Sequence, residues 1–236
     1  MIVVLAIDAL EYALVEKYQC YNLKQKYYGK TDITEFSEPR TMVLWSSFMT
    51  GENKEKQILK LGDKEMWNKS FDIKETFFYN FQAPKIIDLP GFSYDKKLHA
   101  GERELLKAYF TVESPEEKSK IRKEYNDHAF KHHRKIKNEF SESLKGDYDF
   151  LLGYFSIADV IGHLNFGNNL MMKMIYKDLD EISNNIEGNF IVLSDHGMKA
   201  LGIYGDHSGY GFWSTNFIDL RKPKITDFAK ILIDMA

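Results

Sequence analysis

Three short, continuous runs of apolar residues constrain the fold of this chain more than any other feature. They span Ile2–Ile7 (IVVLAI), Asp149–Phe155 (DFLLGYF) and Asn189–Ser194 (NFIVLS). A strand with one solvated face alternates apolar and polar residues, whereas a continuous run is typical of a strand buried on both faces. The runs therefore predict a parallel sheet that helices cover on both sides. Weaker strand candidates lie at Phe77–Phe81, Lys85–Leu89 and Asn216–Leu220.

Helical patterns lie between the predicted strands. The clearest runs from Ser114, which can cap a helix ahead of Pro115, to Lys145, just before Gly146. Its apolar residues recur at helical spacing: Ile121, Tyr125, Ala129, Ile136, Phe140 and Leu144. A second helix is expected from about Leu170 to Ile186. Strands that alternate with helices predict an α/β fold, a three-layer α/β/α sandwich with a mainly parallel sheet, in a single domain over residues 1–236.

The composition excludes several classes of protein. Lys and Arg (32) nearly balance Asp and Glu (35), and the net charge of -3 gives no basic surface for binding a nucleic-acid duplex. Cys20 is the only cysteine, which excludes an internal disulfide framework. The run Ile2–Ile7 is too short to span a membrane. We expect a cytoplasmic protein that does not associate with membranes; the sequence does not predict its oligomeric state.

Residues that can bind metal ions follow the three main strands. In open α/β sheets, sites form at the carboxyl ends of the strands. Three Asp and three His meet this condition or lie in a nearby loop: Asp8, Asp159, His163, Asp195, His196 and His207. Each residue taken alone is also compatible with a helix cap or a surface contact. The run Ser194–Met198 (SDHGM) is the hardest to explain by packing. The set suits Zn, Mn or Fe better than Ca or Mg.

The order of these motifs resembles that of the alkaline phosphatase superfamily. The similarity rests on Asp8 after the first strand, Thr41 ahead of a Thr50–Gly51 pair, Asp159–His163 (DVIGH), Ser194–Met198 and a late His207. Within the superfamily, the chain most resembles the branch of type I phosphodiesterases and nucleotide pyrophosphatases and their archaeal relatives. Ile86–Gly91 is similar to a strand and loop of that group, and Ile225–Leu232 to its closing helix.

The resemblance implies a role for each residue. Thr41 would be the nucleophile, since it precedes the Thr-Gly pair by nine positions. One metal would be held by Asp159, His163 and His207, and the second by Asp8, Asp195, His196 and the oxygen of Thr41. The expected cofactors are two divalent ions, with Zn favoured and Mn as the alternative. Two such ions clamp the attacking and leaving oxygens of a phosphoryl transfer, which would pass through a phospho-Thr41 intermediate.

The residues around Thr41 support part of this picture and depart from the rest. Met42–Phe48 contains no Pro or Gly, so Thr41 can begin a helix whose N-terminus attracts phosphate oxygens. After the Thr-Gly pair, the group that this chain resembles usually has a Pro, a His-Gly-Ile segment and an Asn that helps to hold the phosphoryl oxygen. This chain has Glu52–Ile58 instead, and no Asn is clearly placed for that role. The backbone N–H of Met42 and, as a weaker candidate, Asn68 are the predicted substrate-binding groups.

Several functions remain open at this level. A phosphodiesterase acting on a small phosphate ester is favoured, and a phosphomonoesterase or phosphomutase of the same superfamily is the alternative. A metal-binding module without catalysis is the third possibility. A sulfatase requires a Cys/Ser-x-Pro-x-Arg motif. It is disfavoured here because Arg40 directly follows Pro39, which breaks that spacing. We interpret His128, His132 and His133 as part of a solvated helix face.

Overall fold

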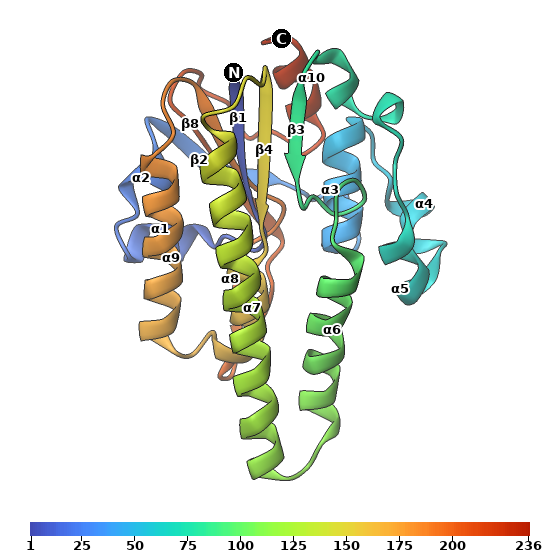
Figure 1. Cartoon of the computed structure of the whole chain (residues 1–236), viewed down its shortest axis with the longest axis vertical. Helices are drawn as coiled ribbons and strands as arrows, with labels where there is room; N and C mark the ends of the chain where they lie inside the picture. The colour runs from blue at the N-terminus through green and yellow to red at the C-terminus, as the bar shows by residue number, and fades with distance from the viewer.

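A six-stranded sheet with the order β2-β8-β5-β1-β4-β3 forms the centre of the computed structural model, which describes residues 1–236 (Figure 1). The strands β3 (Pro84–Ile87), β4 (Phe150–Phe155), β1 (Ile2–Ile7) and β5 (Phe190–Ser194) pair in parallel. At the other edge, β8 (Tyr210–Thr215) is antiparallel to both β5 and β2 (Tyr27–Asp32). The predicted mainly parallel sheet is confirmed.

The continuous apolar character of β1 follows from its position between β4 and β5. Val3, Leu5 and Ile7 contribute to one hydrophobic core, and Val4 and Ala6 contribute to a second core on the opposite face. All five side chains are buried. Because both faces are covered, neither can carry polar side chains without a desolvation cost.

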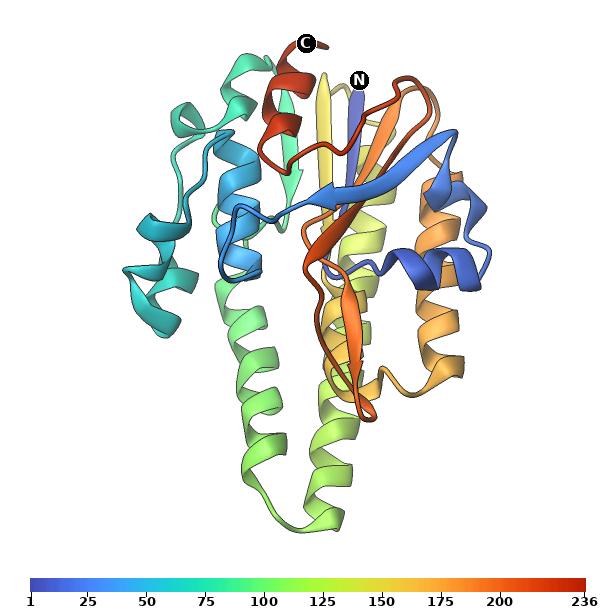
Figure 2. The ribbon, with the colours of Figure 1, turned by 180° about the vertical axis from the view of Figure 1, so that it is seen from behind.

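Helices cover both faces of the sheet, as the three-layer prediction requires (Figures 1 and 2). The first core packs against α1 (Tyr12–Lys17), α2 (Tyr21–Lys24), α7 (Pro115–Ser143), α8 (Ile157–Asn165) and α9 (Asn169–Asn184). The second core packs against α3 (Thr41–Thr50), α10 (Asp227–Ile233) and η3 (Phe77–Asn80), while shorter turns α4 (Glu55–Leu59), α5 (Gly62–Glu65), η1 (Met66–Asn68) and η2 (Ile73–Glu75) surround it.

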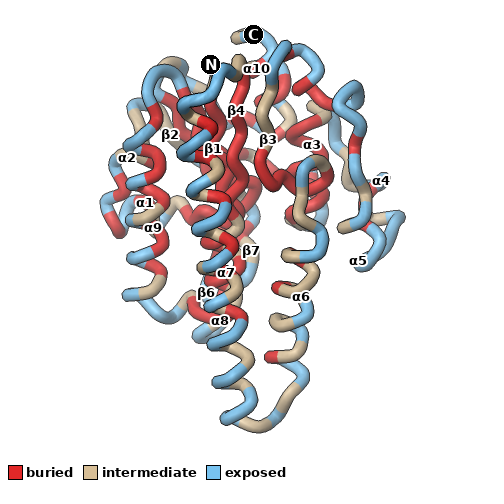
Figure 3. Tube along the Cα trace, viewed as in Figure 1, coloured by how far each residue is buried: buried red, intermediate tan, exposed pale blue.

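A long helical hairpin extends beyond the sheet. It consists of α6 (Lys96–Thr111) and α7, and in Figure 1 its tip lies far below the strand ends. The Ser114 side chain accepts the N–H of Glu117, and Pro115 occupies the first turn, as predicted. The exposed residues concentrate on the outer sides of this hairpin (Figure 3). Beside it, β6 (Met198–Leu201) and β7 (Tyr204–His207) form a separate two-stranded ribbon, in which the Tyr204 hydroxyl lies 3.2 Å from the Tyr109 hydroxyl of α6.

Two of the weaker strand predictions are wrong. Phe77–Phe81 forms a 3-10 turn, because Phe77, Phe78 and Phe81 pack their rings against Phe150 instead of extending along a sheet edge. Asn216–Leu220 is irregular. The strand lies just before this segment, in β8. It ends at Thr215, whose hydroxyl accepts the N–H groups of Phe217 and Ile218. No helix has both the length and the apolar character needed to cross a membrane.

Candidate active site

The carboxyl ends of three neighbouring parallel strands bring the predicted metal ligands to one edge of the sheet. Asp8 follows β1, Asp159 lies in the first turn of α8 just after β4, and Asp195 follows β5. The registers pair Ile7 with Phe155 and Ala6 with Leu193, so the three strands end at the same level. Parallel pairing thus places side chains together that are up to 187 positions apart in sequence.

The local sequence around Asp195 and His196 builds a tight turn. The Ser194 hydroxyl donates to the carbonyl of His196 and accepts the N–H of Leu10, which ties the end of β5 to the end of β1. A side chain at position 197 would collide with the carboxylate of Glu11. Glycine is therefore required directly after the two candidate ligands, which explains the Ser-Asp-His-Gly pattern.

Asp8, Asp195 and His196 form a buried group that we call the inner cluster. The exposed fraction of these residues is 2% or less. His196 Nε2 lies 3.3 Å from Asp8 Oδ1 and 3.4 Å from Asp195 Oδ2. His196 Nδ1 faces the carbonyl of Gly197 at 3.1 Å, so Nε2 is the nitrogen directed at the carboxylates.

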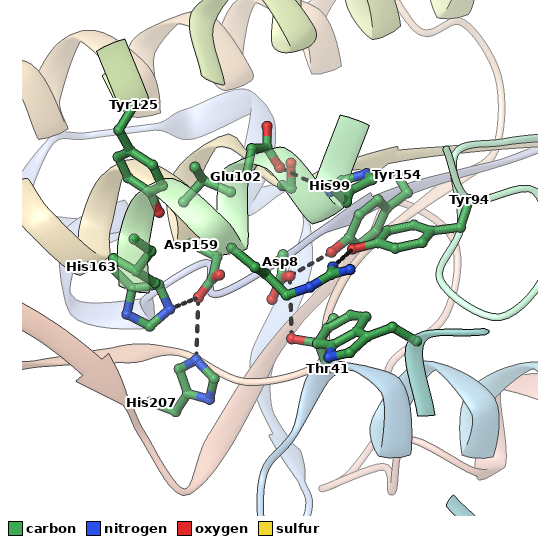
Figure 4. Close-up of a pocket in the computed structure, with 15 residues that line it drawn as sticks. Asp8, Thr41, Tyr94, His99, Glu102, Tyr125, Tyr154, Asp159, His163 and His207 are labelled. Atoms are coloured by element: carbon green, nitrogen blue, oxygen red, sulfur yellow. Dashed lines mark hydrogen bonds and ion pairs between the residues drawn. The ribbon is translucent and has the colours of Figure 1, made fainter. Parts of the chain in front are cut away.

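Asp159, His163 and His207 form a second group, the outer cluster (Figure 4). Both Nε2 atoms lie 3.3 Å from Asp159 Oδ1. Both Nδ1 atoms face backbone carbonyls, that of Gly205 for His163 and that of Pro39 for His207. These contacts orient the rings as histidine ligands are oriented in metal sites. The division into inner and outer clusters matches the ligand groups that the family resemblance implies.

Buried polar atoms without hydrogen-bond partners occur in both clusters. They are Asp8 Oδ1, Asp159 Oδ1, Asp195 Oδ1, Asp195 Oδ2, His196 Nε2 and His207 Nε2. Leaving such atoms unpaired costs roughly 1–3 kcal/mol each, and more for charged groups. A tetrahedral ion with ligands at about 2.0–2.1 Å separates the ligand atoms by roughly 3.3 Å, which is the spacing found here. Both sets therefore fit a divalent cation.

The electrostatics of the inner cluster also favour a cation. Burial raises the pKa of Asp8, and the nearby Asp195 and Asp159 raise it further. Burial likewise raises the pKa of Asp195 to about 7 and lowers the pKa of His196 to about 4. Burial thus disfavours the carboxylate forms of the two Asp unless a positive charge compensates them, and it keeps His196 in the neutral form that binds metal ions. In the outer cluster, burial is outweighed by Asp159, which raises the pKa of His207 to about 9.

Thr41 stands beside the inner cluster at the N-terminus of α3. Arg40 is extended, so the helix begins at Thr41, and it ends at Gly51, whose φ of 70° is left-handed. The Thr41 hydroxyl lies 3.4 Å from Asp8 Oδ2, an oxygen that also accepts a short hydrogen bond from the Tyr154 hydroxyl. As the second residue of α3, Met42 has a backbone N–H without an intrahelical acceptor.

Thr41 and the outer cluster open into a cavity of about 220 Å³ (Figure 4). Asp8 also lines this cavity, and the remaining wall includes Trp67, Tyr94, Arg103, Leu106, Tyr125 and Tyr154. Asn68 does not line this cavity; its side-chain amide donates to Glu65 at 3.1 Å. The sequence did not identify this wall, because its residues come from strand β4 and from helices and turns, with no recognisable motif.

Sequence reasoning also missed a third buried group, formed by Asp88, His99, Glu102 and His132. His132 was expected to be solvated, but it is 3% exposed and that prediction is wrong. Its spacing contained the signal, since position 132 continues the buried stripe of Tyr125, Ala129, Ile136 and Phe140. We call this group the carboxylate–imidazole ring, because Asp88 and Glu102 each contact both imidazoles.

Shorter distances between its atoms distinguish this ring from the two clusters. Asp88 Oδ2 lies 2.8 Å from Nε2 of both His99 and His132, and Glu102 lies 3.0 Å from both Nδ1 atoms. None of these atoms lacks a partner. The spacing is that of charge-assisted hydrogen bonds and is shorter than the roughly 3.3 Å between the ligand atoms of a tetrahedral ion. Although burial opposes the change, the two carboxylates raise the pKa of His132 to about 9, and the imidazoles lower the pKa of Glu102 to about 2.

The molecule is thus an α/β fold with two metal-sized clusters at the carboxyl edge of its sheet. No protein-family model and no curated protein sequence matches the chain. Among solved structures it is similar to murine ectonucleotide pyrophosphatase/phosphodiesterase 5, with 14% identity and a TM-score of 0.42. The inactive variant of that protein in complex with AMP gives 14% identity and a TM-score of 0.43. Each match covers 84% of this chain and 57% of the murine chain.

Proposed function

We propose that this protein is a metal-dependent hydrolase of small phosphate esters in which Thr41 is the nucleophile. One observation carries the proposal: the Thr41 hydroxyl lies 3.4 Å from Asp8 Oδ2. Asp8 belongs to a cluster of orphaned ligand atoms, and the same cavity contains the outer cluster. A nucleophile, two cation-sized ligand sets and a cavity for a substrate are the elements that metal-assisted phosphoryl transfer needs.

The chain would hold two divalent ions, Zn or Mn, one in each cluster. When bound, such ions lower the pKa of an adjacent hydroxyl and neutralise charge that develops on the phosphoryl group. His163 and His207 present Nε2 because their Nδ1 atoms donate to backbone carbonyls. Burial of the inner cluster keeps bulk water from its charged groups, which strengthens electrostatic interactions there.

Thr41 forms the new bond in the reaction we propose. Its oxygen attacks phosphorus as the hydroxyl proton departs, the bond from phosphorus to the leaving oxygen breaks, and the leaving group takes the electron pair of that bond and a proton. Water then attacks phosphorus, the bond from phosphorus to the Thr41 oxygen breaks, the phosphate product is released, and a proton from that water restores the Thr41 hydroxyl. The free N–H of Met42 at the start of α3 would donate to a phosphoryl oxygen. The cavity of about 220 Å³ favours a small ester over a polymer.

A Thr41→Ala variant tests the nucleophile. With Zn or Mn present, wild type should hydrolyse bis-p-nitrophenyl phosphate if it is a diesterase, or p-nitrophenyl phosphate if it is a monoesterase. Thr41→Ala should lose this activity by at least about a thousandfold while keeping two metal equivalents per chain, since six other ligands remain. Thr41→Ser should retain part of it. Full activity in Thr41→Ala, or no turnover of either ester by metal-loaded wild type, would contradict the proposal.

A further inference from the structure

Arg103 is a half-buried cation in the wall of the candidate active site that has no anionic partner. It lines the same cavity as Thr41, Asp8 and His207. No carboxylate lies within ion-pair distance of its guanidinium, whereas Arg40 pairs with both Glu38 and Asp63. A guanidinium presents five N–H donors in a planar fork that matches phosphate oxygens. Arg103 thus carries an unpaired charge and unused donors toward the cavity.

Neutral aromatic groups hold this side chain in place. Arg103 Nη1 donates to the Tyr94 hydroxyl at 3.2 Å, and the guanidinium lies 4.3 Å from the ring centre of Trp67. Trp67 and Tyr94 stack with their ring centroids 5.9 Å apart and an interplanar angle of 19°. These contacts fix the position of the guanidinium but leave its charge uncompensated.

The carboxylate–imidazole ring anchors that arrangement. Tyr94 stacks on His99 with centroids 3.8 Å apart, and His99 is held by Asp88 and Glu102. Since His99 and Glu102 lie on α6 within one turn of Arg103, the ring fixes the helix segment that carries the arginine. The guanidinium is therefore positioned both through its own helix and through Tyr94.

The net charge of the metal-loaded clusters suggests a role for Arg103 as a further positive group for the substrate. The three cluster carboxylates carry three negative charges, and two divalent ions would supply four positive ones, so the loaded clusters retain about one net positive charge. A phosphate ester brings one or two negative charges. Asp8 of the inner cluster and the unpaired Arg103 line the same cavity, so a phosphate ester bound there lies within reach of both the metal-loaded cluster and the guanidinium.

We propose that Arg103 binds a non-bridging oxygen of the phosphoryl group that Thr41 attacks. The inference rests on the proposed function and names a substrate-contacting residue for it. In this arrangement Arg103 faces the phosphoryl group from the aromatic wall of the cavity, and its donors supply charge-assisted hydrogen bonds. Tyr94 and Trp67 act as positioning residues for the guanidinium.

The test compares Arg103→Ala and Arg103→Lys with wild type, with Arg134→Ala as a control. Arg134 is exposed on the other helix of the hairpin and does not line the cavity. Binding of inorganic phosphate to the Zn-loaded proteins is measured by isothermal titration calorimetry, beside kcat/KM for the p-nitrophenyl ester that wild type hydrolyses. Metal content and melting temperature are recorded for each variant.

Arg103→Ala should weaken phosphate binding at least tenfold and lower kcat/KM by about 10²–10³-fold, as loss of one oxyanion donor does in other enzymes. Arg103→Lys should fall between Arg103→Ala and wild type, because it keeps the charge but loses the fork, and Arg134→Ala should match wild type. Unchanged phosphate affinity in a folded, metal-loaded Arg103→Ala protein would overturn the inference, while loss of activity in Thr41→Ala would still support the proposed function.

Two further outcomes are informative. If metal-loaded wild type hydrolyses no ester but binds phosphate in an Arg103-dependent manner, the proposed function fails and the phosphate contact stands. If Arg103→Ala affects only esters with a charged leaving group and leaves phosphate affinity intact, the guanidinium contacts the leaving group, and the inference is overturned.

Discussion

Two regions of this molecule contain the same types of side chain and differ in whether the polar atoms of those side chains have hydrogen-bond partners. The metal-sized clusters and the carboxylate–imidazole ring each combine buried Asp or Glu with His. In the clusters the ligand atoms are 3.3 to 3.4 Å apart and several have no partner. In the ring the contacts are 2.8 to 3.0 Å and every atom is paired. The clusters fit a cation, whereas the ring provides its own counter-charges.

This difference predicts opposite responses to mutation. A residue of the clusters contributes to function through the ion it would hold and destabilises the metal-free protein. A residue of the ring stabilises the fold whether or not metal is present, because removing one partner leaves the other charges buried and unpaired.

The largest effect is expected in the inner cluster, for Asp195→Ala. Its carboxylate is fully buried and neither oxygen has a partner. The variant should bind about one metal equivalent per chain instead of two. Ester hydrolysis should fall by roughly 10³-fold, since a bound ion supplies several kcal/mol of transition-state stabilisation and 1.36 kcal/mol corresponds to tenfold.

Metal analysis by mass spectrometry and thermal melting with and without chelator test this prediction together. The metal-free variant should melt at or above the temperature of metal-free wild type, because a buried carboxyl with a pKa raised to about 7 is removed. Retention of two metal equivalents, or a large loss of stability in the metal-free state, would remove Asp195 from the ligand set.

The second effect is on stability and belongs to the ring. His132→Ala should lower the free energy of unfolding by about 3–5 kcal/mol, because Asp88 and Glu102 each lose a buried ionic partner. The loss should be equal with and without metal. His128→Ala on the same helix is the control; its side chain is 35% exposed, so its loss should not exceed about 1 kcal/mol.

Denaturant unfolding of both variants measures these differences. Metal content separates the two interpretations of the ring: His132→Ala should keep the metal equivalents of wild type. The loss of one equivalent would instead identify Asp88, His99 and His132 as a cation site, and the ring would then not differ in kind from the clusters.

The contrast between the two regions also explains which features could be predicted from sequence. Each cluster ligand follows an apolar strand or lies in a short loop near one, and parallel strands that end at one edge must bring their ends together. Asp8, Asp159 and Asp195 therefore carried enough local information. The ring depends on how α6 packs on α7 and on a loop after β3. Only the spacing of His132 within the buried stripe hinted at this, and nothing in the sequence linked it to Asp88.

The same reasoning applies to the fold and the cavity wall. The buried strands were predictable because their apolar runs are continuous, whereas β8 was not, since Gly211, Ser214 and Thr215 leave it no continuous apolar run and its position depends on antiparallel pairing with β5. Trp67, Tyr94 and Arg103 come from separate turns and a helix. Their meeting is a product of tertiary packing, so no motif could have announced it.

The smallest effect is the pH dependence of the ring. The pKa of His132 is raised from 6.5 to about 9 in the folded protein, so its stabilising contribution is complete below pH 6.5 and is lost as the pH rises through about 9. The pKa of Glu102 is lowered from 4.5 to about 2, so its contribution is complete above pH 4.5 and is lost as the pH falls toward 2. The ring should therefore stabilise the fold most between about pH 4.5 and 6.5.

The measurable quantity is the difference in the free energy of unfolding between wild type and His132→Ala. It should be largest on that plateau and should shrink by roughly 3 kcal/mol or less as the pH rises from 6.5 to about 9, since one pKa unit corresponds to 1.36 kcal/mol. Repeating the series with chelator keeps the clusters out of the measurement. A difference that stays constant from pH 6 to 10 would mean that His132 is neutral in the fold and does not act as a counter-charge to Asp88 and Glu102.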